Sequence, residues 1–262
     1  MSATPQAITD WDPGTYDRFR GPRLRPALDL MRALPELPEG AVVDLGCGNG
    51  AAGPALKMLG RHLIGIDSSA AMLDGAAKTG SYDALSRDDI GQWQPETPPA
   101  LIYSNAALHW LPDHAGLLLR LAAMTAPGGV LAVQMPHQNN APSHRLWVQL
   151  CDELFPRRLD HDSLPSALDP AAYHRLLAPL GELSLWETDY YHQLPAEGSG
   201  HPVRRFTEGA FARPILNLLD PDEGKRLTAA YDRAIASAYP AGDDGSVLFA
   251  MRRLFFTLRR AG

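Results

Sequence analysis

Three acidic side chains and a glycine-rich loop have the types and spacing that point to chemistry. The segment VVDLGCGNG places Asp44 just ahead of Gly46, Gly48 and Gly50, between a short apolar run and a helical pattern. Glycines at a strand-to-helix turn permit a tight bend and let a ligand approach the backbone. The loop also fits the relaxed dinucleotide pattern G-x-G-x-x-G/A, or an ordinary turn, so it does not identify a ligand by itself.

Asp44 favours one class of ligand. A carboxylate at the mouth of the loop repels the pyrophosphate of a nicotinamide dinucleotide and attracts a cation, such as the ammonium of S-adenosylmethionine. Asp67 ends the next apolar run, 23 residues after Asp44, where an acid can hydrogen-bond ribose hydroxyls. Both cofactors contain ribose, so Asp67 indicates a nucleoside only. Its alternative role is a helix N-cap, which Ser68 or Ser69 can fill equally well.

Two further polar residues follow predicted strands. Asp89 can accept a hydrogen bond from an adenine amino group, with Ile90 and Trp93 beside the ring, or it can be a solvated loop acid. Met72 either covers the other adenine face or belongs to the core. Asn105 ends the run ALIYSN. Because ligands bind at the carboxyl ends of parallel strands, polar residues at four successive strand ends favour a cofactor site there.

The elements that position these residues alternate between residues 41 and 135. Short apolar runs typical of buried strands are AVVDLG, HLIGID, ALIYSN and GGVLAVQM, and the helical patterns are GAAGPALKML, SAAMLDGAAK and PDHAGLLLRLAAM. This alternation predicts a doubly wound sheet. Asp113 is expected to cap the helix that follows it.

Beyond residue 141 the spacing changes. SHRLWVQLCDELF and PAAYHRLLAPL predict helices, LSLWETDYYHQL predicts a long strand with alternating faces, and RRLFFTLRR predicts a last strand. Residues 203–239 predict two helices that separate near Leu219-Asp220-Pro221. We expect a single domain over residues 1–262, with a helical segment over the active site at 1–40, a cofactor-binding core at 41–140, and the remaining strands at 141–262 with a helical cap near 203–239.

Composition limits the function classes. The chain has 262 residues, a formal net charge of −6 and two cysteines. The acidic balance argues against a nucleic-acid partner, because phosphate neutralisation needs surplus Lys and Arg. Two cysteines are too few for a disulfide framework, and no run reaches the roughly 20 apolar residues that span a membrane. We therefore expect a cytoplasmic protein, with neither a membrane nor a metal partner, since CxxC and HExxH are absent.

Several segments are more specific than the glycine loop. They include NAALHWLPDH at 105–114, VLAVQMP at 130–136 and TDYYH at 188–192. Over nearly its whole length the chain resembles the trans-aconitate 2-methyltransferase family of class I S-adenosylmethionine-dependent methyltransferases. With the strand pattern, the resemblance implies an α/β fold: a doubly wound, mostly parallel, seven-stranded Rossmann-like sheet with an antiparallel last strand and a helical cap insertion.

The resemblance implies methyl transfer to a carboxylate of trans-aconitate or a related small polycarboxylic acid, giving a monomethyl ester and S-adenosylhomocysteine. Asp44, Gly46 and Gly48 would hold the methionine part, Asp67 the ribose, and Asp89 with Ile90 the adenine. The expected cofactor-binding residues are Asp44, Gly46, Cys47, Gly48, Asp67, Ser68, Met72, Asp89, Ile90 and Asn105.

A carboxylate acceptor has a reference pKa of about 4 and is ionised at neutral pH, so no general base is required. The protein then has to position the acceptor, a task for which arginine suits the remaining carboxylates. Tyr190 and Tyr191 point to opposite faces, so only one reaches a given pocket. The expected substrate-binding residues are Arg23, Arg25, His109, Gln134, Tyr190 and Arg213, and the expected positioning residues are Tyr16, His109 and Trp110.

The chain departs from the family pattern at Asn49, at His109 and at His137-Gln138, where that pattern has Pro, Gln and Asp-Asn. Three alternatives stay open: a methyltransferase for another small acceptor that uses a base such as His109, a non-catalytic cofactor-binding module, and an NAD-linked oxidoreductase, which Asp44 disfavours. We expect a monomer or weak homodimer. His144, His174 and His201 are expected at the surface.

Overall fold

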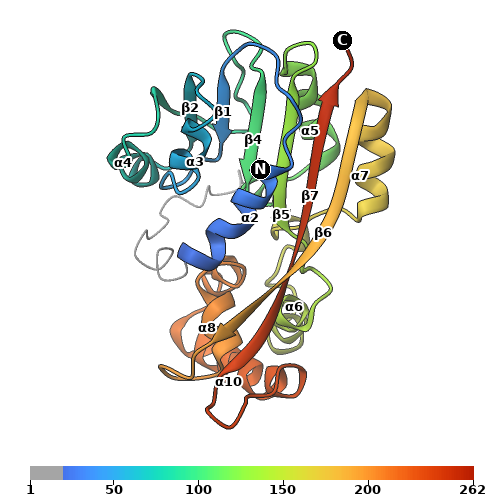
Figure 1. Ribbon diagram of the computed structural model, residues 1–262. Coiled ribbons are helices and arrows are strands. Elements are labelled where there is room, and N and C mark those ends of the chain that lie inside the picture. The colour runs from blue at the N-terminus through green and yellow to red at the C-terminus, as the bar shows by residue number, and fades with distance from the viewer. Residues whose placement is uncertain (1–19) are drawn as a thin grey trace. The chain divides into compact units, whose positions relative to one another are not determined.

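Seven strands form one sheet in the order β3-β2-β1-β4-β5-β7-β6 in the computed structural model, which describes residues 20–262 (Figure 1). Tyr16 and the side chain of Arg23 therefore lie outside the described part of the chain. The strands are β1 (Val42–Leu45), β2 (Leu63–Asp67), β3 (Ala84–Arg87), β4 (Leu101–Asn105), β5 (Val130–Pro136), β6 (Gly181–Leu194) and β7 (Val247–Arg260).

Helices follow most strands at the positions that the sequence predicts. They are α2 (Arg20–Arg32), α3 (Gly53–Lys57), α4 (Ala70–Lys78), α5 (His114–Met124), α6 (Pro142–Leu154), α7 (Pro170–Leu177), α8 (Pro202–Glu208), α9 (Arg213–Leu216) and α10 (Pro221–Ala238). Asp113 caps α5, since its side chain accepts a hydrogen bond from the Gly116 amide. In the described part of the chain, none of the helices has the length and apolar character needed to cross a bilayer.

The segment 203–239 differs from its prediction in one respect. A helix begins after Asp220, as expected, because the Asp220 side chain and Glu223 form a capping box. A second break after Glu208 separates α8 from the short α9, so the segment holds three helices rather than two.

The strand directions confirm the predicted fold class. β1 pairs in parallel with β2 and β4, β2 with β3, and β4 with β5. The Gly129 carbonyl accepts from the Arg260 amide, whereas the His137 amide donates to the Arg252 carbonyl. Residue numbers therefore fall along β7 as they rise along β5, and the last strand is antiparallel.

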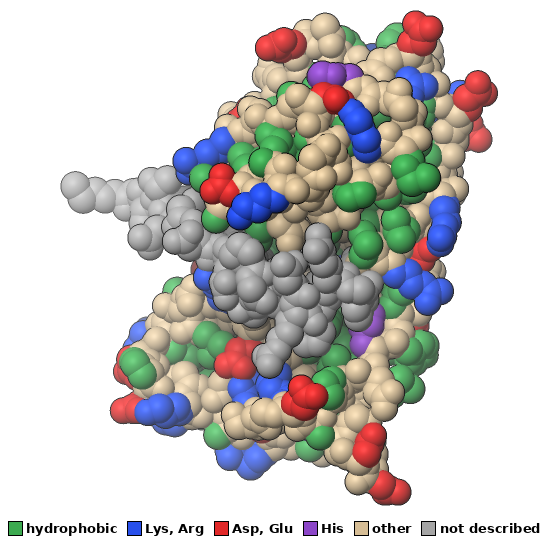
Figure 2. Space-filling model, turned by 60° about the vertical axis from the view of Figure 1, so that its left-hand side comes forward, with side chains coloured by type: hydrophobic (Ala, Val, Ile, Leu, Met, Phe, Trp, Pro, Cys, Tyr) green, Lys and Arg blue, Asp and Glu red, His purple; other side chains and the backbone are tan. Residues whose placement is uncertain are grey.

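The chain divides into two compact units. The first contains residues up to Met135, Leu168–Trp186 and Leu254–Gly262, and the second contains Pro136–Ala167 and Glu187–Arg253. The expected single-domain organisation stays a prediction. On the face drawn in Figure 2, acidic and basic side chains are interspersed and do not gather into a patch of one sign.

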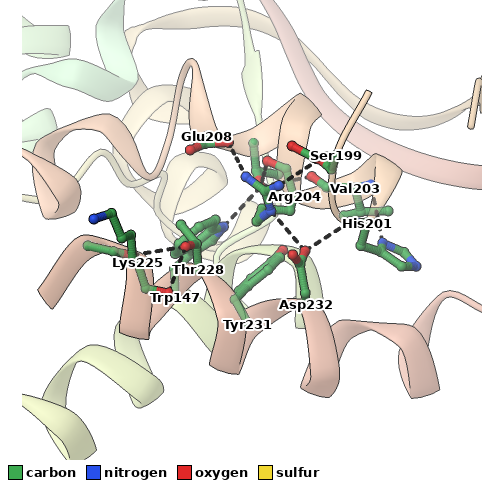
Figure 3. A network of polar contacts seen from close by, with 12 residues as sticks. Trp147, Ser199, His201, Val203, Arg204, Glu208, Lys225, Thr228, Tyr231 and Asp232 are labelled. Atoms are coloured by element: carbon green, nitrogen blue, oxygen red, sulfur yellow. Dashed lines mark hydrogen bonds and ion pairs between the residues drawn. The ribbon is translucent and has the colours of Figure 1, made fainter. Parts of the chain in front are cut away.

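The second unit has an aromatic and polar core of its own. Trp147 stacks on Tyr231 with 4.0 Å between ring centroids, and its indole N–H donates to Thr207 Oγ1 at 2.9 Å. Arg204 on α8 donates to Asp232 on α10 at 2.8 Å and also pairs with Glu208 (Figure 3). These contacts connect α6, α8 and α10 within this unit.

His144 is a correction to the expected surface histidines. It is buried on α6, its ring centroid lies 4.3 Å from that of Phe211, and its Nδ1 lies 3.0 Å from Ser143 Oγ. Burial lowers the pKa of His144 to about 3, with the positive charge of Arg253 as a second cause. Its spacing from the buried Trp147 and Cys151 places it on the apolar stripe of α6, which explains its burial. His174 is exposed as expected, and His201 is half-buried, where it caps α8.

We expect Trp147→Phe to lower the free energy of unfolding by about 1–3 kcal/mol, because it leaves Thr207 without its indole donor and reduces the stacked area. Urea denaturation followed by circular dichroism measures this. Met58→Ala is the control, since Met58 is 85% exposed and a surface change of this kind stays within about 0.5 kcal/mol. Equal midpoints for the Trp147 variant and the parent would contradict the prediction.

Candidate functional site

Four of the predicted polar residues lie on one face of the sheet, at or near the carboxyl ends of adjacent strands. Asp44 is the register partner of Gly65 on β2 and of Tyr103 on β4, and Asn105 is the partner of Gln134 on β5. Side chains alternate along a strand, so residues two apart share a face. Asp44, Asp67, Asn105 and Gln134 therefore point to the same side of the sheet, and they lie toward the carboxyl ends of the strands, where open α/β sheets bind ligands.

Asp44 is the most deeply buried acid of this group, with 2% of its surface exposed. Its Oδ2 accepts a hydrogen bond of 2.7 Å from the Tyr82 hydroxyl. Burial raises the pKa of Asp44 to about 7; the Tyr82 hydrogen bond acts in the opposite direction and the charge of Asp67 adds to the rise. Sequence reasoning missed Tyr82, because nothing in the segment TGSYD indicates a partner for a residue 38 positions away.

Asp67 connects the glycine loop to the start of α4. Its Oδ2 accepts from the Gly48 amide at 2.8 Å, and its Oδ1 accepts from the Ser69 amide at 2.9 Å. A carboxylate has about four acceptor positions, so capacity remains for ribose hydroxyls. Ser69 is the N-cap of α4, and Ser68 is exposed beside it.

Two of the three glycines of the loop, Gly46 and Gly48, lack a side chain for different structural reasons. Gly46 has φ +79°, and a Cβ built on it would lie 2.3 Å from the Ala107 Cβ and 3.2 Å from Ile90 Cδ1. Gly48 has φ +54°, and a Cβ there would meet nothing within 4 Å. Gly46 thus permits close packing of three loops, whereas Gly48 leaves open space beside the backbone. Cys47 between them is buried, and burial raises the pKa of its thiol.

The loop that carries Asp89 is held by an arginine from α5. Arg120 donates to the Ile90 carbonyl at 2.6 Å and to the Trp93 carbonyl at 2.7 Å. Asp89 is exposed, and its Oδ1 accepts from the Gly91 amide at 2.8 Å. Sequence reasoning missed Arg120 as a site residue. The signal that could have indicated it is its position as the one charged residue within the apolar segment GLLLRLAAM. Met72 is buried in α4, and its contact with adenine stays a prediction.

Asn105 and Gln134 carry polar atoms without partners. Within the part of the chain that the structure describes, Asn105 Oδ1 and both amide atoms of Gln134 are buried and make no hydrogen bond. Gln134 is 1% exposed. Leaving such a group unsatisfied costs about 1–3 kcal/mol, so these atoms mark a place where a polar ligand can bind. The adjacent Ala106 has φ +54°, a strained value for alanine, and its amide donates to the Gln134 carbonyl.

The remaining expected site residues are distributed over both units. His109 is 8% exposed in a 3-10 turn that follows β4, and its ring centroid lies 5.1 Å from that of Trp110. Arg25 is exposed on α2, with its Nε 3.8 Å from Asp29 Oδ2. In the second unit, Tyr190 is buried and Tyr191 is 66% exposed, which confirms their opposite faces. Arg213 begins α9 in the same unit.

Known proteins match this sequence along nearly the whole chain. A family profile described as a methyltransferase domain matches residues 16–178. A trans-aconitate 2-methyltransferase of Methylobacterium radiotolerans is 39% identical over 97% of this chain and 100% of its own, and one of Acidovorax ebreus is 39% identical over 96% and 99%. The chain belongs to the trans-aconitate 2-methyltransferase family.

Solved structures agree in fold with this family. The YcgJ protein of Bacillus subtilis superposes with a TM-score of 0.57 at 14% identity, over 90% of this chain and 98% of its own. An N-methyltransferase of Haemonchus contortus has a TM-score of 0.57 at 15% identity, over 98% of this chain and 59% of its own.

The cofactor of this trans-aconitate 2-methyltransferase family member is S-adenosylmethionine. The site is consistent with it in two respects. The open space beside Gly48 leaves room for a ligand close to the backbone, and the acids Asp44 and Asp67 suit a ligand that is cationic and has no phosphate. No cluster of three or more metal-binding side chains occurs among the described residues.

We expect Gly46→Ala to weaken S-adenosylhomocysteine binding more than tenfold, because the added Cβ collides with Ala107 and displaces the loop. Gly60→Ala is the matched control: Gly60 also has a positive φ, +68°, but a Cβ there meets nothing within 4 Å. Isothermal titration calorimetry measures the dissociation constant of S-adenosylhomocysteine for both variants. The comparison separates the effect of the collision at Gly46 from the strain of a positive φ, which both variants share. Equal dissociation constants for the two variants would contradict the prediction.

Proposed function

We propose that this chain transfers the methyl group of S-adenosylmethionine to a carboxylate of trans-aconitate or a related small polycarboxylic acid, forming a monomethyl ester. The observation that carries the proposal is the buried Gln134 amide, whose Nε2 makes no hydrogen bond among the described residues and which lies on the same face as Asp44 and Asp67. Amide N–H groups suit a carboxylate acceptor. Several proteins that share over a third of this sequence are named as trans-aconitate 2-methyltransferases.

Methylation of a carboxylate requires no proton transfer by the protein. S-adenosylmethionine, when bound, supplies an electrophilic methyl group on a sulfonium. A carboxylic acid with a reference pKa of about 4 is already a carboxylate at neutral pH and needs no general base. The chain's own residues must therefore hold the acceptor oxygen in line with the methyl group and exclude water, which contributes about 7–11 kcal/mol in well-oriented reactions.

We assign roles within the first unit accordingly. Asp44 and Asp67 hold the methionine ammonium and the ribose, while the Ile90 loop fixed by Arg120 holds the adenine. Gln134 Nε2 donates to the acceptor carboxylate, and His109 with Trp110 forms the wall that excludes water. The proposed cofactor contacts comprise Asp44, Gly46, Cys47, Gly48, Asp67, Ser68, Met72, Asp89, Ile90 and Asn105.

The remaining carboxylates of the acceptor require cations. Arg213 and Arg25 are proposed for this role, with Tyr190 as a hydrogen-bond donor. For Arg213 and Tyr190, support comes from the family-like segments that contain them. Arg25 is exposed and also lies near Asp29, which makes it the weaker candidate. A monomer or weak homodimer, the lack of a nucleic-acid partner and a cytoplasmic location stay predictions.

A panel of di- and tricarboxylates with methyl-labelled S-adenosylmethionine tests the function directly. We expect label in a base-labile ester with trans-aconitate or a close relative, because carboxyl methyl esters hydrolyse in mild alkali. Stable label on a non-carboxylate acceptor, or no turnover across the panel, would overturn the proposal.

Gln134→Leu tests the amide. We expect the KM for the acid to rise about 10- to 100-fold, the loss of one hydrogen bond to a charged group, while the dissociation constant of S-adenosylhomocysteine stays unchanged. Gln149→Leu is the matched control, because Gln149 lies exposed on α6 and bonds only to Glu153 among the described residues. An unchanged KM in the Gln134 variant would remove this residue from the acceptor site.

His109 distinguishes the second candidate function, methylation of an acceptor that must lose a proton. Its burial beside the end of β4 is the observation that favours that function. For a carboxylate acceptor, we expect His109→Gln to keep kcat within about threefold and to leave the pH profile unchanged, because no proton is transferred. A large loss of kcat, together with the disappearance of an ionisation from the profile, would favour a general base.

A further inference from the structure

We propose that Tyr82 is a positioning residue that keeps the Asp44 carboxylate ionised and correctly aimed for the cationic methyl donor, and that it acts through the hydrogen bond to Asp44 Oδ2. Tyr82 follows β2 in the chain, in the segment between α4 and β3, and its hydroxyl donates to the Asp44 carboxylate. The proposal rests on the proposed role of Asp44 in cofactor binding and is independent of which acid is methylated.

The first observation is a slot in the sheet that fits the Tyr82 ring. Gly65 on β2 is the register partner of Asp44 on β1, so a side chain at Gly65 would stand beside the acid. A Cβ on Gly65 would lie 2.9 Å from Tyr82 Cδ1 and Cε1, and a Cβ on Gly53 would lie 2.7 Å from Tyr82 Cε2. Two missing side chains, from two different elements, therefore let the ring reach across β2 to Asp44.

The second observation is that the neighbouring residue fixes the Tyr82 backbone. The Asp83 amide donates to the Leu63 carbonyl at 2.9 Å, and Asp83 Oδ2 accepts from the Leu63 amide at 2.7 Å. Lys57 pairs with the same carboxylate at 2.6 Å. Tyr82 is thus attached to the start of β2 through Asp83, which holds its hydroxyl 2.7 Å from Asp44.

The surroundings of Asp44 explain why it needs this donor. Among residues 20–262, the groups that act electrostatically with Asp44 are Tyr82, Asp67, Cys47 and Tyr103, all of them acidic or neutral. Burial raises the pKa of Asp44 to about 7, with the charge of Asp67 as a further cause of the rise, and the Tyr82 hydroxyl opposes it. Burial and the Asp44 charge raise the pKa of Tyr82, so its hydroxyl remains a donor.

The ionisation of Asp44 sets how binding of the cationic ligand depends on pH. A cationic ligand prefers the ionised carboxylate, so binding strengthens as the pH rises through the pKa of Asp44 and weakens as the pH falls below it. Removing the Tyr82 hydroxyl disfavours the ionised form, because the carboxylate loses a donor. The pKa of Asp44 then rises, and the weakening begins at a higher pH.

The test is the dissociation constant of S-adenosylhomocysteine for Tyr82→Phe and for the parent, measured by calorimetry from pH 6 to pH 8.5. This probe keeps the methionine ammonium, whose own titration cancels in the ratio of the two constants. For an upward pKa shift of about one unit, the variant binds about tenfold more weakly at pH 6 and less than about twofold more weakly at pH 8.5. A ratio that is constant across this range, or equal to one, would overturn the proposal.

Two controls make the result specific. Tyr103→Phe removes another buried hydroxyl close to Asp44, but one that donates to the Ala27 carbonyl, and we expect its ratio to the parent to stay constant with pH. In an Asp44→Asn background, Tyr82→Phe should lose its pH-dependent effect. If Asp44→Asn binds S-adenosylhomocysteine as tightly as the parent, the role of Asp44 is wrong and this proposal is wrong too. If Asp44→Asn binds more weakly but the ratio of the Tyr82→Phe and parent dissociation constants stays constant with pH, only the role of Tyr82 is overturned.

A measurement on the parent covers the case in which Tyr82→Phe does not fold. Carbon-13 NMR follows the carboxyl resonance that disappears in Asp44→Asn. A midpoint near 7 supports the proposal, because the acid is then poised where one hydrogen bond decides its charge. A midpoint near the ordinary value of 3.8 would overturn it, because an acid with that pKa would stay ionised from pH 6 to pH 8.5 even after a rise of about one unit on loss of the Tyr82 donor.

Discussion

The buried carboxylate of Asp44 is the constraint on which the arrangement of the first unit depends. A charge on the second-last residue of a central strand is costly to remove from water unless donors or a cation compensate it. In the part of the chain that the structure describes, the Tyr82 hydroxyl donates to this carboxylate, through a slot that exists because Gly53 and Gly65 lack side chains. In the proposed role of Asp44, the uncompensated remainder of the charge attracts the ammonium of the cofactor to this edge of the sheet.

The loops around Asp44 are held mainly through their backbones. Asp67 accepts from the Gly48 and Ser69 amides, and Arg120 donates to the carbonyls of Ile90 and Trp93. Side chains used in this way fix the loop shape before a ligand arrives. Such preorganisation lowers the entropy that binding must remove, because the loops are ordered already. The residues that hold the loops are therefore partly different from those proposed to touch the ligand.

The sequence predicts the strands, the fold class and the polar residues at the strand ends, because each depends on local periodicity or on a position within one segment. It does not reveal Tyr82 or Arg120 as site residues, since their roles depend on contacts 38 and about 30 positions away in the chain. His144 was misplaced for another reason: a polar residue on an apolar stripe is buried when the local packing excludes water. Contacts of this kind are set by tertiary structure, and one sequence does not specify them.

Under the proposed function, the choice of a neutral amide at Gln134 has a physical reason. The methyl donor is a cation at sulfur, and the acceptor oxygen must come close to it. An arginine in place of Gln134 would hold the acceptor carboxylate more strongly, but its charge would repel the sulfonium and compete for the negative charge of Asp44. An amide donates to the carboxylate without that penalty. Cations for the other carboxylates then belong farther from the sulfur, so the acceptor's identity is decided by residues away from the methyl group.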